Sequence, residues 1–233
     1  PFLNRTWPWL ARNGRTLLTV GLPLVLSLGL FLVARDWDRF IGSFSYLFSW
    51  SGAAAFGVAL WFAKLCHELG HAYMAKRAGC RVHSMGLAFV VLVPMFYTDV
   101  SDAWRVSDRR SRLLIGAGGV LAEMLLACVA LLVWSLLDDG PLRTAAFLLS
   151  SATWLTTLAI NLNPLMRFDG YFLLSDLLAV DTQQGRAFAL CRWRLRELLF
   201  GYGAPMPEPW PPRLQRRLLL WGYASWVWRA ALF

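Results

Sequence analysis

The stretch Leu65–Gly79, LCHELGHAYMAKRAG, contains a His-Glu-x-x-His motif directly after a long apolar run. His67 and His71 are four residues apart, so on a helix their side chains project from one face and can bind one metal ion. Glu68 lies beside them. A metal site of this kind needs water, whereas the residues before it favour lipid. The stretch therefore predicts a helix that carries a polar metal site at the margin of a membrane.

The composition of the chain is typical of a membrane protein. Of its 233 residues 58% are hydrophobic and 16% are charged, and the mean hydropathy is +0.48, which is more apolar than soluble domains of this size. A spanning helix needs about 20 apolar residues, and five runs approach that length: 16–34, 44–66, 113–137, 144–162 and 218–233. We predict one membrane-embedded domain over residues 1–233, with an all-α polytopic fold of about five transmembrane helices.

The first, second and last apolar runs have features that bear on whether each is a complete span. The first is predicted to be a retained span, because its core is too long for a signal peptide and no small-x-small cleavage site follows it. The second is interrupted by Lys64, which we place close enough to the helix end to snorkel. The chain begins at Pro1 rather than Met, and the last run stops without a polar flank. We therefore expect a fragment of a longer polypeptide.

The basic residues, which give the chain a net charge of +9, fall in alternate loops. They concentrate before the first span, between the second and third, and after the fourth, whereas the opposite loops hold Arg35, Arg39 and Arg143. By the positive-inside rule, the N-terminus and the motif's end of the second span face the cytoplasm, as does the end of the fourth. The positive net charge is thus explained by basic loops on the cytoplasmic side of a lipid bilayer. We therefore expect no nucleic-acid partner.

The segments outside the apolar runs differ in character. Cys80–Val100 is rich in β-branched and aromatic residues and contains Gly86 and Pro94, so we predict strands or a re-entrant hairpin there. Its first part, Cys80–Val93, is the candidate strand edge for binding an extended substrate. Arg186–Phe200 is either a helix on the membrane surface or a solvated basic loop. The four cysteines show no spacing typical of a zinc knuckle or a disulfide framework.

The chemistry of the motif favours zinc. Two imidazole nitrogens and a carboxylate oxygen suit zinc, which keeps an open position for water in catalytic sites. Glu68 would accept the proton of that water as general base and pass it to the leaving amine. Histidines one turn apart cannot ligate opposite faces of a haem, and di-iron sites need more ligands. His83 is predicted to be a polar loop residue.

The third protein ligand is predicted to be an acid on the same side of the membrane. Asp169, Asp99 and Asp102 compete for this role. Asp99 and Asp102 lie in a segment with several serines, where turn and capping roles are common.

Two motifs together resemble the site-2 protease family of intramembrane zinc metalloproteases. The first is HELGH, and the second is NLNPLMRFDG, residues 161–170, which has the family's spacing of Asn161, Pro164, Asp169 and Gly170. The resemblance covers the second span through about Leu178 and implies a core of three spans. It also implies that Glu68 is the catalytic acid/base and that the zinc ligands are His67, His71 and Asp169. Pro164 would stop a regular helix and free the backbone to turn the Asp169 carboxylate inward, and Gly170 would permit the tight turn that follows.

A further stretch, FYTDVSDAW at Phe96–Trp104, resembles a bacterial branch of this family. In that branch the protease core is joined to an extension similar to membrane-fusion proteins and is associated with peptide maturation or export. The resemblance implies a multi-pass protein of the bacterial cytoplasmic (inner) membrane. It also implies a peptide or membrane-protein substrate and an export-system partner.

One position departs from the family pattern inside the third predicted span. Where the family commonly has Gly-Pro-x-x-Asn, this chain has Gly119, Val120 and then Glu123, so that an acid replaces an amide. An ionisable residue inside a span is functional by default. We expect Glu123 to face the site and to contribute to substrate binding together with Asn161 and Asn163.

Two functions from different classes follow. The first is a zinc-dependent endopeptidase that hydrolyses a peptide bond of a membrane or membrane-delivered peptide near the cytoplasmic face. The alternative is a non-proteolytic, zinc-stabilised membrane scaffold that assists peptide export. The scaffold is favoured if Glu123 or a further aspartate closes the fourth zinc position, because structural zinc sites are closed.

Overall fold

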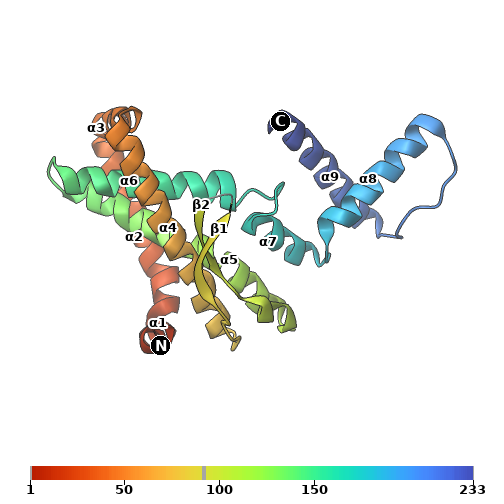
Figure 1. Cartoon of the computed structure of the whole chain (residues 1–233), viewed down its shortest axis with the longest axis horizontal. Coiled ribbons are helices and arrows are strands. Elements are labelled where there is room, and N and C mark those ends of the chain that lie inside the picture. The colour runs from red at the N-terminus through yellow and green to blue at the C-terminus, as the bar shows by residue number, and fades with distance from the viewer. Residues whose placement is uncertain (1, 91–92, 233) are drawn as a thin grey trace. The chain divides into compact units, whose positions relative to one another are not determined.

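The computed structural model describes residues 2–90 and 93–232, most of which are helical (Figure 1). The chain divides into two compact units, Pro1–Asn161 and Leu162–Phe233, which are described in turn.

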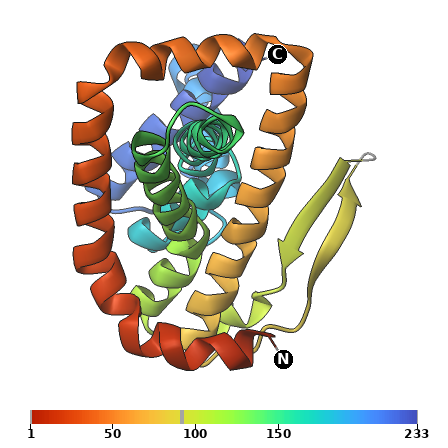
Figure 2. The ribbon, with the colours of Figure 1, turned by 90° about the vertical axis from the view of Figure 1, so that its left-hand side faces the viewer.

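The first unit is a group of helices with one short hairpin. Its elements are α1 (Phe2–Thr16), the π-helical turn η1 (Leu17–Gly21), α2 (Leu22–Arg35), α3 (Trp37–Ser43), the 3-10 helix η2 (Phe44–Phe48), α4 (Trp50–Arg77), β1 (Met85–Val90), β2 (Val93–Thr98), the 3-10 helix η3 (Ser101–Arg105), α5 (Arg109–Leu136), α6 (Pro141–Leu155) and the π-helical turn η4 (Thr156–Asn161). In Figure 2, α2 and α4 form two sides of a frame and α3 crosses between their ends. Helix α5 packs against α2, α4 and α6, and is therefore the central helix of this unit.

The predicted count of five spans can be compared with the helices that are long and apolar enough to cross a membrane. Among the described residues, two segments are long and apolar enough to cross a membrane, Ala11–Arg35 and Arg109–Leu136. They cover the first and third predicted spans. A third is present if the bent pair Trp37–Phe48 and Trp50–Arg77 is counted as one span. The structure thus supports a helical protein with two or three candidate spans, and the predicted count of five is not confirmed.

The second predicted span, 44–66, has the wrong bounds. The chain bends by 102° between η2 and α4, because Ser49 adopts an extended conformation with φ −89° and ψ 152°. The Ser49 hydroxyl accepts a hydrogen bond from the backbone amide of Gly52 at 3.0 Å and thereby caps α4. Helix α4 then continues for 28 residues to Arg77. The histidine motif consequently lies inside this helix rather than after its end.

The fourth and fifth predicted spans form helices that are less apolar than expected. Residues 144–162 fall mainly in α6 and η4, where several serines and threonines interrupt the apolar run. Residues 218–233 fall mainly in α9 (Pro212–Leu232), whose first turns carry Arg213, Arg216 and Arg217. Among the described residues, neither segment reaches the apolarity of a candidate span.

The predicted hairpin after the motif is confirmed. Strands β1 and β2 pair antiparallel, with Met85 opposite Thr98 and Leu87 opposite Phe96. Strand β2 lies against α4, since the rings of Phe96 and Trp61 are 4.4 Å apart. The Thr98 hydroxyl also donates to the carbonyl of Glu68 at 3.1 Å. The hairpin is thereby fixed beside the motif, with β1 on its outer side (Figure 2).

The second unit contains α7 (Asp169–Leu178), α8 (Gln183–Phe200) and α9. The helix predicted as one alternative for Arg186–Phe200 is thus present. The core of the second unit is made of Tyr171, Val180, Ala187, Leu190, Leu218 and Trp221. The Trp221 indole donates to the carbonyl of Pro164 at 2.8 Å, which ties the segment before α7 to α9. Gly170 allows close packing there, because a Cβ would lie 2.4 Å from the carbonyl oxygen of Leu162.

The orientation of α5 can be tested by cysteine labelling. Asp138, just beyond its C-terminal end, and Arg110, at its N-terminal end, are both exposed. In a background without the four native cysteines, we expect Asp138→Cys to react with an impermeant thiol reagent on intact cells and Arg110→Cys to react only after permeabilisation. The reverse labelling would overturn the predicted orientation.

Candidate metal centre

The site is built where α4 and α5 cross at very short range. A Cβ on Gly70 would lie 2.2 Å from the carbonyl oxygen of Gly118, and a Cβ on Gly118 would lie 2.7 Å from that of Gly70. Only glycine at both positions allows the two backbones to touch, as small residues do between membrane helices. This contact brings one face of α4 against one face of α5. The face of α4 carries Lys64, His67 and His71, and the face of α5 carries Ile115, Gly119 and Glu123.

His71 is oriented by the backbone of α5. Its Nδ1 lies 2.8 Å from the carbonyl oxygen of Ile115. A carbonyl only accepts, so Nδ1 carries the proton and donates it, and the lone pair of the neutral ring is on Nε2.

His67 is oriented by a carboxylate. Its Nδ1 lies 3.2 Å from Oε1 of Glu123, and the same reasoning places the proton on Nδ1 and the lone pair on Nε2. Gly119 leaves the space for this ring, because a Cβ there would lie 2.4 Å from the His67 Cε1. His67 is buried, with 6% of its surface exposed.

The two histidines thus turn the same kind of atom toward each other. Their Nε2 atoms are 3.1 Å apart. Two lone pairs at this distance repel unless a cation lies between them. Two ligands of a tetrahedral zinc with Zn–N bonds of about 2.0–2.1 Å are separated by about 3.3 Å. The pair therefore fits zinc, and each ring already has the outer partner that is usual for a ligating histidine.

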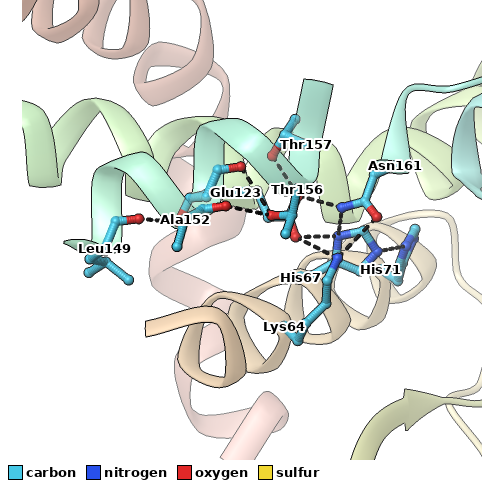
Figure 3. A network of polar contacts seen from close by, with 10 residues as sticks. Lys64, His67, His71, Glu123, Leu149, Ala152, Thr156, Thr157 and Asn161 are labelled. Atoms are coloured by element: carbon cyan, nitrogen blue, oxygen red, sulfur yellow. Dashed lines mark hydrogen bonds and ion pairs between the residues drawn. The ribbon is translucent and has the colours of Figure 1, made fainter. Parts of the chain in front are cut away.

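A buried polar network surrounds Glu123 (Figure 3). Its Oε1 accepts from Lys64 Nζ at 3.0 Å, and its Oε2 accepts from Thr157 Oγ1 and Asn161 Nδ2, both at 2.6 Å. Asn161 Oδ1 accepts from Lys64 at 3.0 Å. The predicted snorkelling of Lys64 is therefore wrong, since α4 continues beyond it and its ammonium points to Glu123. Glu123 itself is fully buried, so the expectation that it faces the interior is met.

The remaining predicted site residues lie as follows. Glu68 is partly exposed on α4, and Thr98 holds its carbonyl. Asn163 Oδ1 accepts from the amide of Leu165 at 2.9 Å, which stabilises the turn before α7. Asp169 is the first residue of α7. The roles assigned to these residues stay predictions.

The competing acids have local partners in the turn after β2. Hydrogen bonds from the hydroxyl and amide of Ser101 hold the pKa of Asp99 below its usual range. Asp102 lies 3.6 Å from the guanidinium of Arg105 and 3.9 Å from His83. These contacts agree with the predicted turn and loop roles.

Three contributors were missed from the sequence, namely Lys64, the carbonyl of Ile115 and the hydroxyl of Thr157, and only Lys64 left a signal. Lys64 precedes His67 by three residues and His71 by seven, which places all three on one helix face. The carbonyl of Ile115 left no signal, because a backbone group belongs to every residue and its use depends on how the helices cross.

A histidine pair of this geometry, with a glutamate in the motif and apolar helices around it, is typical of membrane zinc metallopeptidases. Residues 55–156 match the family model described as peptidase family M50. This segment, which is under half of the chain, is therefore similar to peptidase family M50. The matched segment contains His67, Glu68, His71 and Glu123, and it ends before Asp169.

A similar protein is known from Bacillus subtilis (strain 168), under the name "Putative peptide zinc metalloprotease protein YydH". It is 32% identical over 117 residues, which are 49% of this chain and 44% of the relative. The chain thus matches less than half of the length of that relative. No solved structure matches the chain.

The space that Gly119 leaves for His67 gives a prediction. Gly119→Ala should displace the His67 ring from Glu123 and raise the dissociation constant for zinc at least about tenfold, as loss of an outer partner does. Gly57→Ala is the matched control on α4, because a Cβ there meets nothing within 4 Å. Chelator competition on the purified protein measures both, and equal zinc affinity in the two variants would contradict the assigned geometry.

Proposed function

We propose that this chain is a zinc-dependent endopeptidase of the site-2 protease type. Its substrate is a membrane or membrane-delivered peptide, cut near the cytoplasmic face. The observation that carries the proposal is the approach of the two Nε2 atoms to 3.1 Å, with the Nδ1 of each ring already donating to a protein oxygen. The family match and the relative's printed name support zinc and peptide chemistry.

The proposed roles of the chain's own residues follow from their chemistry. His67, His71 and Asp169 would hold the zinc, whose Lewis acidity would make water a stronger nucleophile at neutral pH. Glu68 accepts the proton of the attacking water and delivers it to the leaving amine. The Thr98 hydroxyl donates to the Glu68 carbonyl. The backbone of α4 at this base is therefore also held by β2.

The substrate is proposed to bind as an extended segment. Among the described residues β1 pairs with β2 alone, so its outer edge presents backbone groups to a further strand. Leu87 and Phe89 on β1 are exposed, which suits an apolar peptide or lipid beside the hairpin. Asn161 and Asn163 are the proposed polar residues of the substrate and water path.

The setting is proposed to be the bacterial cytoplasmic membrane. The distribution of basic residues places the N-terminus on the cytoplasmic side, together with the end of α4 that carries the histidine motif. An export-system partner is consistent with the resemblance of Phe96–Trp104 to the branch associated with peptide export. The whole of residues 1–233 is proposed to act as one membrane-embedded peptidase domain.

The zinc-stabilised scaffold is the weaker alternative. It requires a further protein ligand to close the zinc site. Glu123 was one candidate, but four donors engage its two oxygens. To bind zinc directly, Glu123 would have to give up its contact with His67.

Replacing the general base tests the reaction. Glu68→Gln keeps the side chain's shape and spares the ligands, so zinc content should remain near one per chain while cleavage falls about 10²–10⁴-fold. The assay is co-expression with small peptides encoded beside the gene, followed by mass spectrometry of their truncation products. Glu208→Gln, in the loop between α8 and α9, is the matched control. Full cleavage by Glu68→Gln would refute the peptidase assignment.

Metal analysis tests the third ligand. Asp169→Ala should lose zinc as severely as His71→Ala, because removal of one of three protein ligands weakens both affinity and geometry. Asp99→Ala and Asp102→Ala should retain most of it, since both acids have partners in their own turn. Stoichiometric zinc in purified Asp169→Ala, with loss in the Asp102 variant, would reverse the assignment.

A further inference from the structure

Glu123 has no role in the proposed reaction, yet all of its acceptor capacity is used. Lys64 and His67 donate to Oε1, and Thr157 and Asn161 donate to Oε2. Four donors around two oxygens require an ionised carboxylate, because a protonated acid or an amide would direct hydrogens of its own at some of them. The side chain is fully buried, so this charge is held without water.

We propose that Glu123 is a positioning residue of the metal centre. It holds His67 with the proton on Nδ1 and the lone pair on Nε2, aimed at the Nε2 of His71. This inference rests on the proposed function, since it takes His67 to be a zinc ligand. The two ligands are thereby fixed in different ways, because His71 donates to a backbone carbonyl of α5 and His67 donates to a carboxylate of the same helix.

Lys64 makes this arrangement possible. An unpaired carboxylate inside an apolar helix bundle is costly, and a paired and hydrogen-bonded one is tolerated. Lys64 supplies the opposite charge from the same helix that carries His67, three residues before it. Asn161 joins the pair, because its Oδ1 accepts from Lys64 while its Nδ2 donates to Glu123. These two contacts fix the orientation of the amide.

The contacts favour this role over the substrate binding expected for Glu123 from the sequence. A substrate amide would have to displace Thr157 or Asn161 from Oε2, or Lys64 or His67 from Oε1. Asn161 does not replace Glu123 as the acceptor for His67. Its Nδ2 approaches the His67 Nδ1 to 3.4 Å, but both nitrogens are donors and each is closer to an oxygen of Glu123.

The test separates positioning from mere charge balance. Glu123→Met leaves Lys64 unpaired, whereas the double variant Lys64→Met/Glu123→Met removes both charges and replaces them by apolar side chains of similar length. Ser150→Ala is the matched control, because Ser150 is equally buried between α5 and α6 and donates to Ala127, away from His67. The zinc dissociation constant is measured by chelator competition, and the unfolding temperature is measured in the same detergent.

For Glu123→Met we expect a lower unfolding temperature and a zinc dissociation constant raised about 10–100-fold. In the double variant the unfolding temperature should recover, because no charge is left unpaired. The dissociation constant should stay raised about 10–100-fold, because His67 still lacks its carboxylate. Ser150→Ala should bind zinc as the unmodified protein does.

Two results would overturn the inference, and they are distinguishable. If the double variant recovers zinc affinity together with stability, Glu123 is only the counter-ion of Lys64, and the proposed function stands. If neither the unmodified protein nor Ser150→Ala binds zinc, the proposed metal centre fails and the inference fails with it. Should Glu123→Met not fold, the double variant carries the test alone.

Discussion

The metal centre depends on the contact between the backbones of α4 and α5 at Gly70 and Gly118. With no side chain at either position, a carbonyl oxygen of each helix lies where a Cβ of the other would need space. At this separation the carbonyl of Ile115 reaches His71 and the carboxylate of Glu123 reaches His67. A Cβ at either position would lie too close to a carbonyl oxygen of the other helix, so the helices would have to move apart and lengthen these hydrogen bonds. The geometry of the ligands is therefore set by helix packing rather than by the motif alone.

The apolar surroundings explain why the polar groups are so completely paired. For a group buried among apolar helices, an unsatisfied donor or acceptor costs its full desolvation energy. The network of Lys64, Glu123, Thr157 and Asn161 meets this demand internally. It joins three segments that are distant in the sequence, because α5 contributes the acid, α4 the cation, and the π-helical turn η4 the amide and hydroxyl. Such turns often mark functional positions, since they change the direction of side chains within a helix.

The sequence predicted several local features around the site better than the bounds of the helices. The histidine pair, the interior position of Glu123 and the hairpin after the motif all follow from local patterns, namely i,i+4 spacing, an acid within an apolar run and a short β-branched segment. The bend at Ser49 was missed because apolar composition continues across it, and only the capping hydroxyl marks a helix start there. The predicted count of five spans is not confirmed, because arginines and hydroxyl residues reduce the apolarity of α6 and α9. The contact of Lys64 with Glu123 depends on which faces meet, and a single sequence does not specify that.

The acid at position 123 and the lysine at position 64 form one physical unit. An asparagine, the residue that the family resemblance leads one to expect there, offers two acceptor sites and two donor hydrogens, so it cannot accept from four donors. With an amide in place of the acid, the ammonium of Lys64 would lack its counter-charge. With an acid and no lysine, the bundle would hold an uncompensated negative charge. The pair together adds no net charge to the bundle, so the carboxylate can orient His67 without leaving an uncompensated charge among the apolar helices.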